Sequence, residues 1–102
     1  MSRKLAITTR AAQEVRRAAA ASGAEGLPLR VAAKREEDGS VQLGIGFDTE
    51  RTRDELIETA GVTLLVSHHS RDLLEDMVLD FVELDSGEPA FVVVPAPPED
   101  GA

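Results

Sequence analysis

The sequence predicts one mainly β domain of the α+β class, a small mixed β-sandwich or pseudo-barrel with an N-terminal helix and one short second helix. Three observations support this fold class. Small apolar residues recur at helical spacing over residues 10–22 and stop at Gly23. From residue 29 the apolar period changes to two, as in strands that pack on one face. Segments 62–67 and 90–95 are nearly continuous apolar runs of strand length.

The first predicted element is the helix. Thr8 or Thr9 precedes it, and either hydroxyl can accept a free amide of the first turn. The positions expected to be buried follow the helical period and are Ala11, Val15, Ala18 and Ser22. Because this stripe is narrow and its side chains are small, we expect the helix to lie on a sheet.

A β-hairpin follows, with strands at residues 29–34 and 41–47. Apolar residues alternate along both strands, and the charged turn between them contains Asp38 and Gly39, a pair typical of turns. Gly44 and Gly46 lie on the face opposite the apolar row of the second strand. They predict a bend or the close approach of another backbone.

The remaining elements are a short strand within residues 56–61, the apolar strand 62–67, a short helix over 69–77 with Ser70 as its capping candidate, and strands at 78–84 and 90–95. Pro95 closes the last strand. We expect residues 1–95 to form a single domain and 96–102 a flexible acidic tail.

Composition excludes several classes of site. The chain has no cysteine, which removes disulfides, thiolate metal sites, cysteine-held clusters and cysteine nucleophiles. It has three Phe and no Trp or Tyr, so large stacking platforms for single-stranded nucleic acid are missing.

Charge and hydropathy limit the kinds of partner that this chain is expected to bind. Residues 1–35 carry a net +6, and the rest of the chain brings the total to −8, so most of the molecule repels a duplex phosphate surface. No segment approaches the ~20 apolar residues that span a bilayer, and the first ten residues contain no signal-peptide core. We therefore expect a cytoplasmic protein that binds neither nucleic acid nor membranes.

Several segments, read together, resemble the A-type iron–sulfur cluster carriers, the HesB-like domain family that includes the IscA-type proteins. The similarity spans about residues 5–100 and is carried by "AITTRAAQEVRRA", "LPLRVAAK", "VQLGIGFD", "GVTLLVS" and "LDFVEL". The resemblance implies the fold of that family, and in the family three cysteines hold the metal or cluster.

This chain departs from the family at the ligand positions. The first family cysteine belongs at the hairpin tip, and counting from Arg30 or from Phe47 both lead to Asp38. The other two form a Cys-Gly-Cys pair near the C-terminus, where the count from Pro95 leads to Gly101 and a position past Ala102. A cluster carrier needs soft thiolate ligands, and one carboxylate is a hard, exchangeable substitute for them. The chain is similar in kind to cysteine-free relatives found near bacterial sulfur-oxidation genes.

Three residues are candidate metal ligands. Asp38, beside Glu36 and Glu37, offers oxygens that suit a hard cation, although a solvated turn explains the same residues. His68 and His69 are the only imidazoles and precede the acidic Asp72 and Glu75, although neighbouring side chains on a strand or helix point in different directions. A surface junction between strand and helix explains them equally well.

Catalysis and nucleotide binding lack support. The segment "SHHSRD" contains the letters of a hydrolase triad, but no Gly-x-Ser-x-Gly elbow occurs. Gly44-x-Gly46 lies within a strand, and Thr49 stands where a third glycine would be needed. We assign no catalytic residue and no cofactor.

The leading hypothesis from sequence is a non-enzymatic, carrier-like accessory protein of iron–sulfur cluster or sulfur metabolism that has lost cluster ligation and acts through protein partners. The alternative is a module that binds iron or another hard divalent cation through carboxylate and histidine ligands. Self-association through exposed strand edges stays open.

Overall fold

The computed structural model describes residues 3–97 and contains two helices and seven strands. Their order along the chain is β1 (Ala6–Ile7), α1 (Thr9–Ser22), β2 (Leu29–Arg35), β3 (Val41–Phe47), β4 (Asp54–Thr59), β5 (Val62–Ser67), α2 (Arg71–Leu74), β6 (Met77–Glu83) and β7 (Pro89–Pro95). Residues 98–102, most of the predicted tail, lie outside the described part of the chain.

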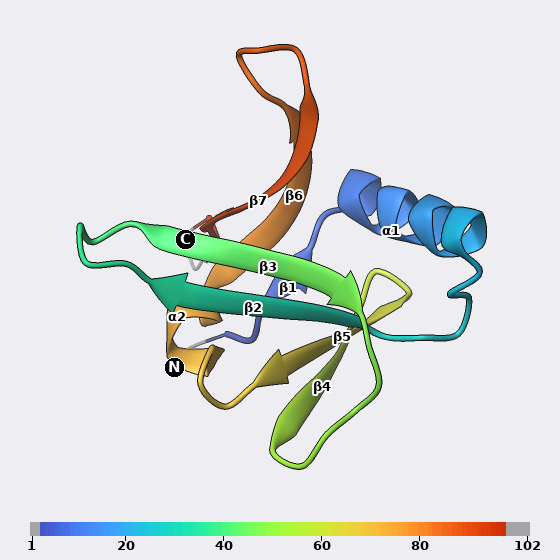
Figure 1. Cartoon of the computed structure of the whole chain (residues 1–102), viewed down its shortest axis with the longest axis horizontal. Coiled ribbons are helices and arrows are strands. Elements are labelled where there is room, and N and C mark those ends of the chain that lie inside the picture. The colour runs from blue at the N-terminus through green and yellow to red at the C-terminus, as the bar shows by residue number, and fades with distance from the viewer. Residues whose placement is uncertain (1–2, 98–102) are drawn as a thin grey trace, which may run out of the picture.

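The strands form two mixed sheets (Figure 1). One has the order β1-β6-β7, with β1 parallel to β6, and the other has the order β3-β2-β5-β4, with β2 parallel to β5. No strand ladder joins the two sheets within residues 3–97, so the fold is not a closed barrel. The predicted fold class, mainly β with an N-terminal helix and a short second helix, is confirmed.

Helix α1 begins and ends where the sequence predicts. The hydroxyl of Thr8 accepts a hydrogen bond from the backbone N–H of Ala11 at 3.2 Å, and Gly23 terminates the helix in the left-handed conformation (φ 72°). The predicted buried stripe is partly wrong. Besides Ala11 and Val15 it contains Ala12 and Ala19, whereas Ala18 is half-buried and Ser22 is exposed. The buried stripe is wider than predicted because α1 contacts a strand of each sheet, β6 and β5.

The predicted hairpin β2–β3 is present, and its register places Val31 opposite Ile45 and Ala33 opposite Leu43. The apolar row of β2 is buried, but that of the edge strand β3 is only half-buried or exposed. The expected close approach of a backbone to Gly44 and Gly46 is wrong, because a Cβ at either position would meet nothing within 4 Å. Both glycines face open space on the outer side of the sheet.

The second helix is shorter than predicted. It covers only Arg71–Leu74, because Ser67–Ser70 form a turn and Met77 already belongs to β6. The Ser70 side chain makes no capping hydrogen bond. Its hydroxyl instead accepts the N–H of Ala33 at 3.0 Å and donates to the Ala33 carbonyl at 3.3 Å. Strand β5 pairs with β2 only at Leu29 and Arg30. Further along β2, Ser70 therefore supplies the hydrogen-bond partner that the backbone N–H and carbonyl of Ala33 need.

One aliphatic core lies between the sheets and under α1. Its fully buried members come from α1, β2, β5, α2 and β6, and the largest are Leu64, Leu74, Leu79, Val31 and Val66. Near the end of the described chain, Ala96 donates to the Asp76 carbonyl at 2.8 Å and the Pro97 carbonyl accepts from Arg3 at 2.9 Å. No helix within residues 3–97 has the length and apolar character that crossing a membrane requires.

Candidate functional site

The tip of hairpin β2–β3 holds Asp38, the first metal candidate. The Glu36 N–H donates a hydrogen bond to the Ser40 carbonyl at 2.7 Å, which closes the turn, and Gly39 adopts a φ of 89°. One Asp38 oxygen accepts both the Ser40 N–H at 3.0 Å and the Ser40 hydroxyl at 2.6 Å. These bonds from Ser40, the hydroxyl first, hold the pKa of Asp38 below its ordinary value. The carboxylate thus organises its own turn.

The two histidines lie exposed in the turn between β5 and α2. Their ring centroids are 3.9 Å apart and the ring planes are tilted by 39°. Partial desolvation, and then the positive charges of His69, Arg53 and Arg71, lower the pKa of His68. At neutral pH His68 therefore favours its uncharged form.

The structure does not bring the candidate ligands together. Among residues 3–97, no group of three or more His, Asp or Glu side chains is arranged to hold a metal ion. An iron–sulfur cluster, as cargo, needs soft thiolates, and the hairpin tip offers a hard carboxylate already bonded to Ser40. The residues present do not fit a cluster.

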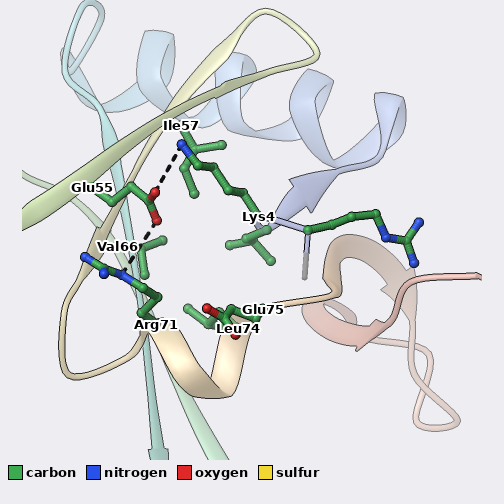
Figure 2. A pocket seen from close by; sticks show the side chains of 9 residues that line it. Lys4, Glu55, Ile57, Val66, Arg71, Leu74 and Glu75 are labelled. Atoms are coloured by element: carbon green, nitrogen blue, oxygen red, sulfur yellow. Dashed lines mark ion pairs between the residues drawn. The ribbon is translucent and has the colours of Figure 1, made fainter. Parts of the chain in front are cut away.

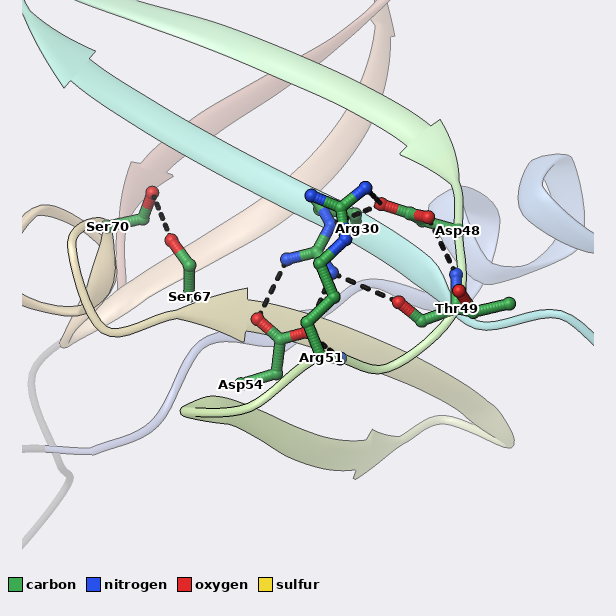
Figure 3. Close-up of polar contacts among 7 residues, drawn as sticks. All are labelled: Arg30, Asp48, Thr49, Arg51, Asp54, Ser67 and Ser70. Atoms are coloured by element: carbon green, nitrogen blue, oxygen red, sulfur yellow. Dashed lines mark hydrogen bonds and ion pairs between the residues drawn. The ribbon is translucent and has the colours of Figure 1, made fainter.

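Arg30, which projects from β2, is the centre of a network of hydrogen bonds (Figure 3). It donates two hydrogen bonds to Asp54, at 2.7 and 2.9 Å, and one to Asp48 at 2.7 Å. A further bond at 3.2 Å reaches the Thr49 carbonyl. The single guanidinium therefore ties the end of β3 and the loop after it to the start of β4.

Burial makes this network electrostatically strong. The Asp54 side chain is only 3% exposed and that of Arg30 is 18% exposed. Hydrogen bonds from Arg30 lower the pKa of Asp54 to about 2, and they also lower the pKa of Asp48. Leu65, the ladder neighbour of Arg30 on β5, is fully buried beside it. The outer face of the sheet is thus covered at this point.

A second ionic group joins α1 to β6. Asp80 accepts two hydrogen bonds from Arg10, at 2.8 and 2.7 Å, and one from the Thr8 hydroxyl at 2.7 Å. These bonds, with that of Arg10 the strongest, hold the pKa of Asp80 far below its usual range. Thr8 therefore caps the helix and links it to the sheet at the same time.

Figure 2 shows a hollow between the N-terminal segment, β4, β5 and α2, of about 170 Å³. Glu55 lies between two cations there, 3.1 Å from the Lys4 amine and 3.9 Å from the nearest nitrogen of Arg71. Apolar side chains such as Ile57 and Leu74 line much of the rest. The central carboxylate of this hollow is therefore already paired with two cations.

Comparison with protein families identifies the scaffold. The family model described as "Iron-sulphur cluster biosynthesis" matches residues 3–88. The chain belongs to this family. It is a member of the HesB-like, A-type carrier group, and it has no cysteine.

Solved structures agree on the fold. The crystal structure of Escherichia coli SufA, involved in biosynthesis of iron–sulfur clusters, superposes with a TM-score of 0.71 at 20% identity, covering 90% of this chain and 80% of SufA. The structure of IscA with its [2Fe-2S] cluster gives a TM-score of 0.72 at 23% identity, covering 89% of this chain and 84% of IscA. Identities this low establish the shared fold alone. A search of curated proteins found no match.

Sequence reasoning missed the two ionic groups that organise this family member. Arg30 serves there only as a landmark of the resemblance, and Asp48, Asp54 and Asp80 are not candidates. A signal existed for the first group, since Arg30 lies between the buried Leu29 and Val31 of one strand. A cation at such a position needs a partner nearby, but the sequence does not say which carboxylate supplies it.

Proposed function

We propose that this family member is a non-enzymatic accessory protein of iron–sulfur cluster or sulfur metabolism, which works in the cytoplasm through protein contacts and does not ligate a cluster. One combined observation carries the proposal. The family scaffold is matched over residues 3–88, and the chain that forms it contains no thiol. A family scaffold formed by a chain without a thiol favours a role for the protein surface.

The hairpin tip supports the loss of ligation. Asp38 is engaged by Ser40, and a carboxylate holds the iron of a cluster far less durably than a thiolate does. The tip is therefore a turn without the thiolate chemistry of the family site.

Several of the basic side chains in the first third of the chain are paired with carboxylates. Arg10 pairs with Asp80, Arg17 pairs with Glu14, and Arg30 pairs with Asp48 and Asp54. The remaining excess is acidic, with a net charge of −8. A partner that binds by charge would accordingly present a basic face.

Reconstitution tests the absence of ligation. The purified chain is incubated anaerobically with ferrous iron and sulfide, desalted, and measured by visible absorption and iron content, with IscA treated in parallel as the positive control. We expect cluster absorption from IscA and none above background from this chain. Stoichiometric cluster uptake by the unmodified chain would refute the proposal.

Partner capture tests the role of the surface. The tagged chain is cross-linked in its native cells, and the captured proteins are identified by mass spectrometry against a tag-only control. We expect enrichment of proteins that assemble iron–sulfur clusters or handle reduced sulfur. Capture indistinguishable from the tag alone would contradict an accessory role, even where reconstitution shows no cluster.

A further inference from the structure

Strand β7 forms an uncharged free edge. It is the outermost strand of the sheet β1-β6-β7, and Figure 1 shows the β6–β7 hairpin extending away from the rest of the fold. Its sequence from Pro89 to Pro95 is PAFVVVP and carries no charge. Val94 is 41% exposed, which is high for a large apolar side chain. Edges of this composition are templates for another strand.

The ladder shows which β7 groups face outward. The Leu79 carbonyl accepts the Thr8 N–H on the β1 side, at 3.0 Å, and Leu79 is opposite Val93. Their pair is therefore a non-hydrogen-bonded pair of the antiparallel ladder, and the Val93 N–H and carbonyl point away from β6. By the same alternation those of Phe91 also point outward. The Leu84 N–H bonds to the Glu88 carbonyl at 2.8 Å, as this alternation requires.

The two prolines limit this edge. Pro89 and Pro95 alternate along β7 with Phe91 and Val93, so their backbone groups also point away from β6. Proline, however, has no N–H to donate. The β6–β7 ladder loses no hydrogen bond, because an N–H at these two positions would point away from β6. The N–H groups of β7 that point outward are therefore those of Phe91 and Val93. Within residues 3–97 neither of these N–H groups has a hydrogen-bond partner outside its own sheet.

This edge is complementary to itself. If two copies run antiparallel about a two-fold axis at Val92, Phe91 of each lies opposite Val93 of the other. Both outward donors of each copy then meet outward carbonyls of the second copy, and no donor is left over. Each proline lies opposite a proline, where no N–H is missed.

Charge also favours this arrangement. Two chains of net charge −8 repel each other, so an interface needs an uncharged segment. In the antiparallel pair the acidic hairpin tips, which contain Glu83, Asp85 and Glu88, lie at opposite ends of the joined strands. The other sheet has two edge strands, β3 and β4. Strand β3 has the acidic Glu36, Glu37 and Asp38 close to one end, and β4, with the sequence DELIET, carries three acidic residues itself.

We propose that β7 pairs with β7 of a second copy of this chain about a two-fold axis at Val92, joining the two three-stranded sheets into one continuous sheet. The inference concerns self-association and goes beyond the function proposed above. It does not depend on whether a cluster is bound.

Single cysteines in this cysteine-free chain test the register. In the proposed pair Val92 of one copy lies directly opposite Val92 of the other, at a distance that suits a disulfide. Val92→Cys should therefore oxidise almost completely to a covalent dimer. The matched control is Val94→Cys. The two Val94 positions are four residues apart along the ladder, roughly 13 Å, which exceeds disulfide reach.

The control separates pairing from random collision. Val94 is exposed whereas Val92 is half-buried, so collisional oxidation would favour Val94→Cys. Under the proposal Val94→Cys stays mostly monomeric alone but cross-links when mixed with Ala90→Cys, because these two positions are opposite in the pair. Equal or faster dimer formation by Val94→Cys alone would overturn the register.

Sedimentation tests the pair without cross-linking. The unmodified chain should show a concentration-dependent monomer–dimer equilibrium. Val93→Pro removes an outward donor that the β6–β7 ladder does not use, and should raise the dissociation constant about tenfold or more. The control is Val41→Pro, which removes an outward donor from β3 and should leave the dimer unchanged. Circular dichroism confirms that both variants fold.

Two outcomes would contradict the proposal. One is a wild-type chain that remains monomeric at all accessible concentrations. The other is a dimer that Val41→Pro weakens and Val93→Pro does not, since that result places the contact at β3.

Discussion

The guanidinium of Arg30 and the carboxylate of Asp54 form a bidentate pair, with bonds of 2.9 and 2.7 Å, across 24 residues of sequence. The pair is nearly buried and shares its cation with Asp48. A buried, hydrogen-bonded charge costs little while its partner is present and a great deal when the partner is removed. This asymmetry makes the fold sensitive to the loss of either partner.

Replacing Arg30 should strongly destabilise the protein. Arg30→Ala leaves the Asp54 carboxylate buried without its cation, and we expect the free energy of unfolding to fall by about 3–5 kcal/mol. Urea denaturation measures this loss. The matched control is Arg51→Ala, whose side chain is 71% exposed and should change stability by less than about 1 kcal/mol. Equal effects of the two substitutions would show that the Arg30 network contributes little.

The same pair should make stability depend on pH. The pKa of Asp54 in the folded protein is about 2, below its ordinary value of 3.8, because Arg30 stabilises the carboxylate. The corresponding stability is present above about pH 4 and is lost as pH falls toward 2, to the extent of about 2 kcal/mol. Asp54→Asn should flatten this part of the profile in denaturation experiments between pH 5 and 2. An unchanged slope in Asp54→Asn would assign the acid sensitivity to another group.

Ser70 should be required for the edge of β2. Ser70→Ala removes the hydroxyl that bonds both backbone groups of Ala33 in a site only 3% exposed, and should cost about 1–3 kcal/mol. Hydrogen exchange should show faster exchange at the Ala33 amide than at other β2 amides. Ser86→Ala, in the exposed β6–β7 turn, serves as the control and should change neither quantity. Unaltered protection of Ala33 would contradict this role.

Thr8 and Thr9 are adjacent but should respond differently. Thr8→Val removes the helix cap to Ala11 and the hydrogen bond to Asp80, and we expect a loss of about 1–2 kcal/mol. Thr9 is exposed in the first turn of α1, so Thr9→Val should be nearly neutral. Thermal unfolding of the pair of variants gives the comparison, and similar melting temperatures would argue against the cap.

Metal binding by the sequence candidates has a direct test. Because Asp38 is bonded to Ser40 and no group of ligands surrounds it within residues 3–97, we expect Asp38→Ala and His68→Ala to leave any affinity for Mg²⁺, Mn²⁺ or Fe²⁺ unchanged in titration calorimetry. A loss of saturable binding in either variant would support the hard-cation alternative instead.

Local patterns were sufficient where neighbouring residues decide the structure. The alternation around residues 29–47 predicted the hairpin, since the period of two and the Asp38–Gly39 turn act over a few residues. The limits of α1 followed from Thr8 and Gly23 in the same way. The second helix was predicted too long because the start of β6 at Met77 depends on its pairing with Pro95, which local sequence does not encode.

By itself, the sequence determined the fold class, the β2–β3 hairpin, the family resemblance and the absence of any cysteine thiolate from this chain. Only the tertiary structure decided which charges meet. Arg30 lies 24 residues from Asp54, and Arg10 lies 70 residues from Asp80. Periodicity reports which face of an element is buried, whereas a charge pair depends on how distant elements pack, and that information appears only when the chain is folded.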